Sequence, residues 1–241
     1  PRCNKAIGGA LMRPIRASID LGALRHNLAV ARRHAANAKI MAVVKANAYG
    51  HGLMRAARGL RDADAFAVLE LDAAVRLREA GYAHRILLLE GFFAASELET
   101  ISDHRLATVV HSMEQVRLLR STRLKQKLEV HLKVNTGMNR LGIALSGVPR
   151  AIELLQSAQI AQIALMTHFA CAEERDGVHE QLQRFEQVAS TQPLPRNLAN
   201  SAALLRHPST HADWVRPGIM LYGASPFDDQ NAEELGLRPA M

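Results

Sequence analysis

The amino-acid sequence predicts an α/β protein that folds as a (β/α)8 barrel of the TIM type. Its 241 residues are enough for one barrel of this kind. Short apolar segments alternate along the chain with segments that have helical periodicity. This alternation predicts parallel strands joined by right-handed helical crossovers. Basic and hydroxyl side chains follow several of the apolar segments, at the rim where barrel enzymes build their sites.

The chain begins with segments that do not belong to the barrel repeat. Residues 1–11 are typical of an upstream extension or a tag remnant, because Met12 would make a natural start. Arg16 to Leu21 has the pattern of a strand, and Leu24 to Ala35 has the pattern of the first barrel helix.

Apolar segments then recur at fairly regular intervals, and we predict that each one is a strand. Eight such strands favour a closed barrel over an open sheet. The predicted strands are Ile40–Val44, Ala65–Leu69, Ile86–Leu89, Ala107–Val110, Leu128–Val134, Ile160–Met166, Leu198–Asn200 and Val215–Tyr222.

Amphipathic helices are predicted between these strands. In the stretch from Leu71 to Arg78, apolar residues fall at i, i+3 and i+4 spacings. The stretch from Val148 to Leu155 has the same kind of pattern, with apolar residues at i, i+4 and i+7. Each stretch therefore has one face suited to packing against the strands.

Composition excludes several classes of protein. Hydrophobic residues make up 48% of the chain and charged residues 22%, which is the balance of a globular protein. No apolar run approaches the roughly 20 residues that cross a bilayer, so we expect no membrane contact and a cytoplasmic protein. The net charge is +7, but arginines are spread along the chain, so we expect no nucleic-acid partner. Two cysteines are too few for a disulfide framework, and no metal site is predicted.

The most informative segment is Val43-Val44-Lys45-Ala46-Asn47-Ala48-Tyr49-Gly50-His51-Gly52, in which a lysine ends an apolar strand. A partly desolvated lysine at a barrel mouth has a lowered pKa, because burial disfavours the ammonium form. Its neutral amine can attack an aldehyde. The alternative is a lysine whose ammonium simply reaches water from the strand end.

Other strand ends place more basic and hydroxyl groups at the same rim. A second lysine, Lys133, ends the fifth strand, and His168 follows the sixth. Ser201 after the seventh strand and Gly218 in the eighth suit a phosphate, because a hydroxyl and an unobstructed backbone amide can both bind it. Taken singly, Ser201 could be a helix N-cap and Gly218 a packing glycine.

These segments resemble the alanine racemase family from about Arg13 to the last residue. The motifs VVKANAYGHG, KVNTGMNRLG, THFA, NSAA and VRPGIMLYGASP occur in the family's order and at similar separations. LLLEGFF, at Leu87 to Phe93, also looks like the family. The resemblance implies a pyridoxal 5'-phosphate enzyme that interconverts L-alanine and D-alanine, for peptidoglycan or for D-alanine catabolism.

The resemblance also implies roles for individual residues around the cofactor. Lys45 would carry the cofactor as a Schiff base. Tyr49, Ser201, Gly218 and Ile219 would hold its phosphate.

Four further residues receive roles by the same resemblance. Arg216 would face the pyridine nitrogen and oppose ring protonation, and His168 would support Arg216 unless it is simply a core histidine. Arg140 would approach the cofactor's phenolic oxygen and the substrate carboxylate. Lys133 stands where the family often carries a carbamylated lysine that fixes Arg140. Asn135 replaces an aspartate common in relatives, which weakens the inference around Arg140.

Family resemblance also divides the chain. Residues 12–21 would form a strand that pairs with a further β domain, residues 22–233 the cofactor-binding barrel, and residues 234–241 the start of that β domain. In the family this domain supplies a catalytic tyrosine to the partner subunit of a homodimer. Racemisation needs a base on each face of the α-carbon, so we expect these 241 residues alone to bind the cofactor but to racemise alanine poorly.

Three alternatives remain open at the level of sequence. One is a single-domain barrel that binds pyridoxal phosphate for cofactor supply. Another is a different enzyme of the same fold type, such as a broad-specificity racemase or a diamino acid decarboxylase. The third is a basic anion-binding module without enzymatic activity.

Overall fold

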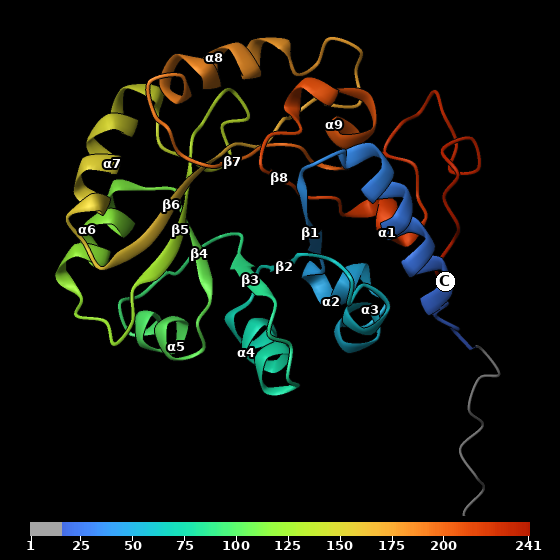
Figure 1. Cartoon of the computed structure of the whole chain (residues 1–241), viewed down its shortest axis with the longest axis horizontal. Coiled ribbons are helices and arrows are strands. Elements are labelled where there is room, and N and C mark those ends of the chain that lie inside the picture. The colour runs from blue at the N-terminus through green and yellow to red at the C-terminus, as the bar shows by residue number, and fades with distance from the viewer. Residues whose placement is uncertain (1–15) are drawn as a thin grey trace, which may run out of the picture.

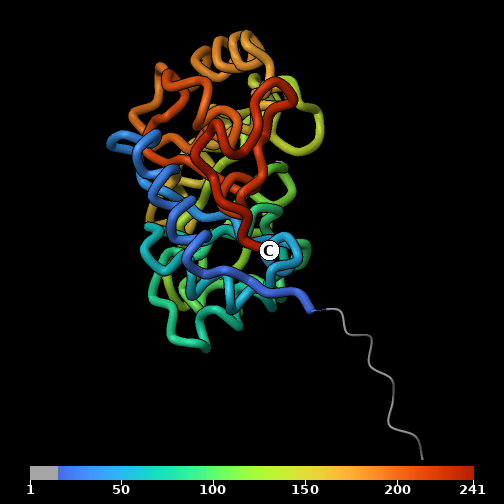
Figure 2. Tube along the Cα trace, turned by 90° about the vertical axis from the view of Figure 1, so that its right-hand side faces the viewer, coloured from blue at the N-terminus to red at the C-terminus, as the bar shows by residue number. Residues whose placement is uncertain are grey.

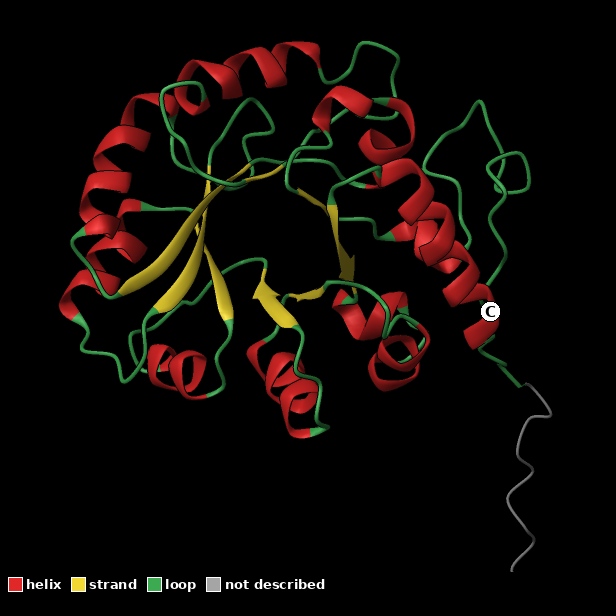
Figure 3. Cartoon of the chain, viewed as in Figure 1, coloured by secondary structure: helices red, strands yellow, loops and turns green. Residues whose placement is uncertain are grey.

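The structure is a computed structural model that describes residues 16–241, and it confirms the predicted barrel (Figure 1). Each parallel strand pairs with the next along the chain, and the last closes on the first through Lys39 opposite Trp214. Figure 3 shows the strands as an inner ring with helices outside it. The strands are β1 (Lys39–Val43), β2 (Ala65–Val68), β3 (Arg85–Leu88), β4 (Ala107–Val110), β5 (Leu128–Lys133), β6 (Ile160–Met166), β7 (Arg196–Asn197) and β8 (Trp214–Val215).

Helices follow most of the strands and pack against the outside of the barrel. The helices are α1 (Leu21–Ala35), α2 (Lys45–Tyr49), α3 (Leu53–Gly59), α4 (Leu71–Glu79), α5 (Glu97–Asp103), α6 (Met113–Ser121), α7 (Val148–Gln156), α8 (His179–Ala189) and α9 (Ser201–Arg206). Short 3-10 helices are η1 (Leu145–Gly147), η2 (Pro208–Thr210) and η3 (Ile219–Tyr222).

Strand side chains alternate between the helix-facing core and the barrel interior. On β1, Ile40 and Ala42 belong to the large core shared with the helices, whereas Met41 and Val43 belong to a small separate cluster inside the barrel. This period of two is what buried parallel strands require. It also decides which side chains can reach the two mouths of the barrel.

Two predicted strands differ from the structure. The seventh is not Leu198–Asn200 but the polar pair Arg196–Asn197, which pairs with β6. The eighth ends at Val215, not at Tyr222, and η3 occupies the end of the predicted segment. Pro217 explains the early end, because it has no N–H to continue the ladder.

The predicted strand over residues 16–21 is also not formed in the described residues. Residues 16–20 have no strand partner, and α1 begins at Leu21 rather than Leu24. Asp20 is the N-cap, since its Oδ1 accepts hydrogen bonds from the N–H groups of Gly22 and Ala23 at 2.7 and 3.1 Å. Residues 1–11 and 12–15 lie outside the described residues, so the predicted extension and domain boundaries stay predictions.

The end of the described chain returns to its beginning. The N–H of Asp20 donates to the carbonyl of Ala240 at 2.9 Å. Asn27 on α1 is buried and donates to the carbonyls of Leu221 and Arg238 at 3.1 and 2.8 Å. The segment after η3 therefore lies against α1, as Figure 2 shows.

The helices around the barrel are mostly short. None of those within residues 16–241 is both long and apolar enough to cross a bilayer.

Candidate functional site

A pocket of about 340 Å³ opens at the carboxyl ends of the strands, where barrel enzymes bind their ligands. All the site residues predicted from sequence line this one pocket. They are Lys45, Tyr49, Lys133, Arg140, His168, Ser201, Arg216, Gly218 and Ile219.

Lys45 lies directly after β1, at the start of a turn with an unusual backbone. The next residues, Ala46 to Tyr49, have φ values of 51°, 52°, 57° and 51°, so α2 is a single left-handed turn. A left-handed conformation costs a residue other than glycine roughly 1–2 kcal/mol. Such strain persists only where tertiary contacts impose it, and it is often found at functional sites.

Several contacts hold this turn. The N–H of Leu53 donates to Oδ1 of Asn47 at 2.9 Å, and Gly52 donates to the carbonyl of Asn47 at the same distance. Gly50 and Gly52 leave the turn at φ values of 87° and 90°, which glycine adopts without steric cost. The glycines of the VVKANAYGHG motif therefore serve the geometry around Lys45.

Two tyrosines join this turn to the segment after β8. The ring centroids of Tyr49 and Tyr222 are 4.8 Å apart, and the Tyr222 hydroxyl donates to the carbonyl of Val43 at 2.9 Å. A Cβ atom on Gly218 would lie 2.6 Å from the Tyr49 hydroxyl. Glycine is therefore required at this position for space.

The backbone of Gly218 faces the start of α9. Its N–H donates to Oγ of Ser201 at 2.8 Å, and the N–H of Met220 lies 3.5 Å from the same oxygen. Asn200, not Ser201, is the N-cap of α9, since its side chain accepts from the N–H of Ala203. The Ser201 hydroxyl therefore remains at the pocket wall, where it and the Tyr49 hydroxyl can bind an anion.

Arg216 is a buried cation at the floor of the pocket, with only 4% of its surface exposed. Its Nη1 donates to the carbonyl and to Oδ1 of Asn197 at 2.6 and 2.5 Å. Its Nη2 donates to the carbonyls of Thr167 and Leu198 at 2.8 and 3.1 Å. Burial lowers the pKa of Arg216 to about 9, and these acceptors fix the guanidinium in place.

Two residues that complete this network are not among the predicted ones. Nδ2 of Asn197 lies 3.1 Å from Nδ1 of His131, which is on the inward face of β5. Burial, followed by the charges of Arg216 and Arg85, lowers the pKa of His131 to about 3. The imidazole is therefore neutral, and its Nδ1 accepts a hydrogen bond from the Asn197 amide. A polar residue within an apolar strand is the sequence signal that marks His131.

His168 lines the pocket but has no hydrogen bond to Arg216 among the described contacts; the bonds to that guanidinium come from Asn197 and backbone carbonyls. Burial lowers the pKa of His168 to about 3, and the charges of Arg216 and Lys133 add to this effect. His168 is thus a neutral imidazole in a cationic pocket.

Lys133 ends β5 and is only 6% exposed. Burial lowers its pKa to about 8, helped by Arg216 and Arg140 and opposed by Glu90. A larger part of this amine is therefore uncharged near neutral pH than in an ordinary lysine. Arg140 lies in the loop after β5 and is exposed at the pocket rim, so the rim carries a charge that solvent can reach.

Asn135 organises the loop that carries Arg140. Its Oδ1 accepts from the N–H groups of Gly137 and Asn139, each at 3.1 Å, and its Nδ2 donates to Oδ1 of Asn139 at 2.9 Å. A Cβ atom on Gly142 would lie 2.6 Å from the backbone nitrogen of Asn135. Asn135 thus acts locally on loop shape.

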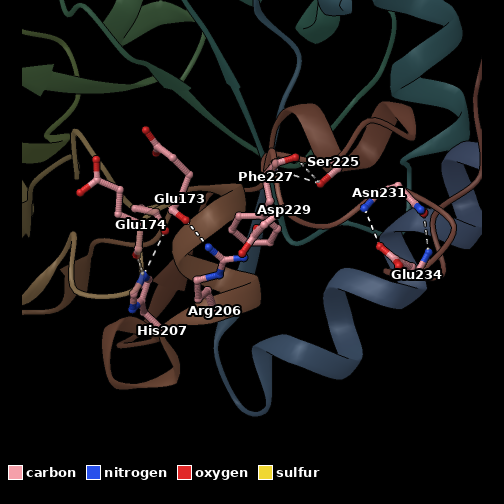
Figure 4. Close-up of polar contacts among 10 residues, drawn as sticks. Glu173, Glu174, Arg206, His207, Ser225, Phe227, Asp229, Asn231 and Glu234 are labelled. Carbon is pink, nitrogen blue, oxygen red and sulfur yellow. Dashed lines mark hydrogen bonds and ion pairs between the residues drawn. The ribbon is translucent and has the colours of Figure 1, made fainter.

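Arg206 at the end of α9 ties together two segments of the pocket rim (Figure 4). It donates to the carbonyl of Glu173, and its Nη2 lies 2.6 Å from Oδ1 of Asp229. Its guanidinium also stacks 3.8 Å from the Phe227 ring centroid. Because Glu173 and Pro226 both line the pocket, Arg206 fixes one side of the pocket mouth.

The pocket therefore combines a lysine on a strained turn with a buried guanidinium. One wall consists of the Tyr49 and Ser201 hydroxyls and the Gly218 amide, and we call this wall the cradle. The cations of the pocket outnumber its carboxylates, which are Glu90 and Glu173. Such a pocket suits a small anion with a group that an amine can attack. No group of three or more His, Cys, Asp or Glu side chains in residues 16–241 is arranged to hold a metal ion.

Comparisons with known proteins match nearly all of the chain. The family model described as "Alanine racemase, N-terminal domain" matches residues 19–226. An alanine racemase of Nitrosospira multiformis is 57% identical over 235 residues, which cover 96% of this chain and 66% of the relative. An alanine racemase of Nitrosomonas eutropha is 54% identical over 237 residues, with the same coverage.

Solved structures give the same result. The biosynthetic alanine racemase of Pseudomonas aeruginosa superposes with a TM-score of 0.92 at 44% identity, covering 95% of this chain and 65% of that one. The alanine racemase of Acinetobacter baumannii superposes with a TM-score of 0.86 at 36% identity. The chain spans just under two thirds of the length of the curated relatives that it matches first.

Proposed function

The chain belongs to the alanine racemase family, and we propose on this premise that it binds pyridoxal 5'-phosphate at Lys45 and takes part in interconverting L-alanine and D-alanine. The observation that carries the proposal is the cradle beside Lys45. There, the Gly218 N–H donates to Ser201 Oγ at 2.8 Å. The Tyr49 hydroxyl occupies the space that a Cβ atom on Gly218 would need.

The pocket residues fit this cofactor. A volume of about 340 Å³ lies within the range of sites for small ligands. A phosphate needs several donors, and the hydroxyls of Tyr49 and Ser201 with the backbone N–H of Ile219 offer them at one wall, while the Gly218 N–H positions Ser201 Oγ. Lys45 lines the same pocket, so one molecule can engage both the phosphate cradle and the amine. The bound cofactor would withdraw electrons from the α-carbon of an attached amino acid, so that its α-proton can leave.

Lys45 would have two tasks. Its amine would hold the cofactor covalently, and it would then move the α-proton on one face of the substrate. The strained turn from Ala46 to Tyr49 supports both tasks, because it fixes the backbone directly after the lysine. The geometry of the amine is thus preorganised by the fold.

Arg216 would face the ring nitrogen of the cofactor. A guanidinium held by Asn197, Thr167 and Leu198 cannot easily turn away, and its charge opposes protonation of a neighbouring nitrogen. Less electron withdrawal by the bound cofactor would limit side reactions such as transamination. His168, neutral beside it, adds no competing positive charge.

Arg140 and Lys133 would act on the substrate side. Arg140 is at the exposed rim, where it can bind the substrate carboxylate as well as the phenolic oxygen of the cofactor. The lowered pKa of Lys133 makes its amine available for carbamylation, which would convert a repelling neighbour of Arg140 into an attracting one.

The second base is proposed to come from a partner subunit. The chain has three tyrosines. Tyr49 is at the cradle, Tyr222 donates to the carbonyl of Val43, and Tyr82 lines a different cavity at the other end of the barrel. A homodimer in which another domain supplies the base would complete the site. The product would serve peptidoglycan synthesis or D-alanine catabolism.

Among the alternatives, a cofactor-supply barrel and an anion-binding module receive no support from the relatives named above. A racemase of broader specificity is the alternative that substrate assays separate from the main proposal.

Reductive trapping tests this assignment. The protein would be incubated with pyridoxal phosphate, reduced with borohydride, digested and mapped by mass spectrometry. We expect the adduct on the peptide that contains Lys45, and its loss in Lys45→Ala. Lys125→Ala, at an exposed lysine outside this pocket, is the matched control and should label normally. An adduct mainly on another lysine would overturn the assignment.

A further inference from the structure

A second cavity, of about 900 Å³, opens at the opposite end of the barrel. It is lined by residues at the amino ends of the strands, among them Lys39 of β1, Arg85 of β3 and Trp214 of β8. Glu129 lines this cavity, whereas Lys133 lines the proposed cofactor pocket. Both side chains lie on the inward face of β5. Four residues of strand span about 13 Å, so the two sites are distinct.

We call this second cavity, at the amino ends of the strands, the lower cavity. Its carboxylates already have partners. Oδ2 of Asp64 lies 2.5 Å from Nη1 of Arg32 and accepts from the N–H of Ile40 at 2.7 Å. Glu129 forms a two-pronged pair with Arg85, at 2.5 Å to Nε and 3.0 Å to Nη2. Neither carboxylate is therefore left to neutralise further cations.

The remaining cations fall into two kinds. Arg78 is a structural residue, because its guanidinium donates to the backbone carbonyls of Tyr82, His84, His104 and Arg105. Lys39, Arg105 and Lys127 line the cavity, are exposed, and form no ion pair among the described residues. Three cations thus share one concave surface, where their charges reinforce one another.

Trp214 forms the floor. It is only 6% exposed, and its ring lies 5.5 Å from Nζ of Lys39 and 4.9 Å from Cζ of Arg85. These contacts hold two cations at the mouth of the barrel. Because Trp214 is almost fully buried, little ring surface is left for an aromatic ligand to stack on, so recognition depends on charge.

One more lining residue has an unmet hydrogen-bonding group. Nε2 of His84 lies 2.8 Å from the carbonyl of Arg61, but Nδ1 is buried and has no partner among the described residues. Buried polar atoms rarely stay unpartnered. Because Nε2 donates to this carbonyl, Nδ1 is an acceptor that needs a donor, so His84 does not itself bind an oxyanion.

We propose that the lower cavity binds a small multivalent oxyanion, one that carries two or more phosphate or carboxylate groups. Lys39, Arg105 and Lys127 would provide the attraction, while the paired carboxylates add no net repulsion. The site lies outside the proposed cofactor pocket, so it is a second ligand site in this protein. The proposal does not depend on the proposed racemase activity.

Trp214 reports on this cavity directly, because it is the single tryptophan of the chain. The protein would first be loaded with pyridoxal phosphate, so that the proposed cofactor pocket is filled. It would then be titrated with sodium pyrophosphate while tryptophan fluorescence is recorded. Citrate titrated in the same way distinguishes carboxylates from phosphates. Sodium chloride at matched ionic strength controls for screening. We expect a saturable change with at least one of the two anions and none with chloride.

Variants tie the signal to the cavity. We expect Lys39→Gln combined with Lys127→Gln to weaken binding about tenfold, since removing each exposed charge should reduce the affinity a few-fold. Arg150→Gln, on α7 and outside the cavity, is the matched control and should bind as the parent does. Circular dichroism confirms folding, and Arg105→Gln replaces the double variant if that variant fails to fold.

Two results would overturn the proposal. One is a fluorescence response to pyrophosphate and citrate that is no greater than the response to chloride. The other is unchanged affinity in the cavity variants, which would place the anion elsewhere.

Discussion

The guanidinium of Arg216 donates a 2.5 Å hydrogen bond to the side chain of Asn197, inside the barrel and beneath the proposed cofactor pocket. The amide of Asn197 also reaches His131, at 3.1 Å. Asn197 is therefore shared between the cation at the pocket floor and a buried imidazole. Arg216 owes its position to this residue as well as to backbone carbonyls.

We predict that Asn197→Ala destabilises the protein by about 1–3 kcal/mol, because it leaves a buried charged donor and His131 each short of a partner. It should also weaken pyridoxal phosphate binding, since Arg216 becomes free to turn. Urea unfolding and absorbance titration measure the two effects. Asn37→Ala, at an exposed asparagine whose side chain has no hydrogen bond among the described residues, is the control. A variant as stable as the parent would contradict the role given to Asn197.

The buried histidines predict how stability depends on pH. His131 and His168 have pKa values lowered to about 3, against about 6.5 when unfolded. Their neutral forms therefore stabilise the fold fully above about pH 6.5, and this contribution is lost as pH falls towards 3. Each group should change the free energy of unfolding by about 1.4 kcal/mol per pH unit within this window.

Urea unfolding between pH 4 and pH 7 tests this dependence. In His131→Gln the free energy of unfolding should depend less on pH, by about 1.4 kcal/mol per pH unit, because one titrating group is removed. His179→Gln, at an exposed histidine, should leave this dependence unchanged. An equal slope in parent and His131→Gln would show that His131 is not the titrating group.

Gly218 gives a steric prediction. In Gly218→Ala the new Cβ would lie 2.6 Å from the Tyr49 hydroxyl, so it would displace the Tyr49 ring, which packs against Tyr222. We expect affinity for pyridoxal phosphate to fall at least tenfold, as judged by absorbance titration. Gly147→Ala, on η1 and outside the pocket, should bind normally. Parent-like affinity in Gly218→Ala would mean that the phosphate lies elsewhere.

Lys133 gives a chemical prediction. With a pKa lowered to about 8, its amine should react with dissolved carbon dioxide at mildly alkaline pH, and the reaction should fade as pH drops below 8. Isotopically labelled bicarbonate followed by NMR would show a carbamate signal. The signal should disappear in Lys133→Arg but persist in Lys127→Arg. A signal that persists in Lys133→Arg would assign it to another amine.

Much of the fold could be predicted because buried strands have a simple signature. Ala107–Val110 and Ile160–Met166 agree with β4 and β6 at both ends, since apolar runs mark strands covered on both faces. This rule does not predict β7. Its residues, Arg196 and Asn197, are polar, and Asn197 is buried only because His131 and Arg216 receive its side chain.

The candidate site could likewise be predicted only in part. The motifs predict that Lys45, Gly218 and Arg216 lie at one rim of the barrel, and all three line one pocket. The left-handed turn after Lys45 could not be predicted, because nothing in Ala46-Asn47-Ala48 favours positive φ enough to offset its cost. The contact between Asn197 and His131 joins residues 66 positions apart, so neither local propensity nor spacing reveals it.

The last prediction concerns the number of bases. If Lys45 moves the α-proton on one face and the second base comes from a partner subunit, this chain on its own supplies, through residues 16–241, one of the two bases that the reaction needs. With pyridoxal phosphate in deuterated water, it should exchange the α-hydrogen of one alanine enantiomer faster than it inverts that enantiomer. NMR measures exchange, and chiral chromatography measures inversion. Lys45→Ala should abolish exchange, while Lys125→Ala should retain it. Inversion as fast as exchange in the isolated chain would mean that both bases lie within it, and the assignment of the second base to a partner would then be wrong.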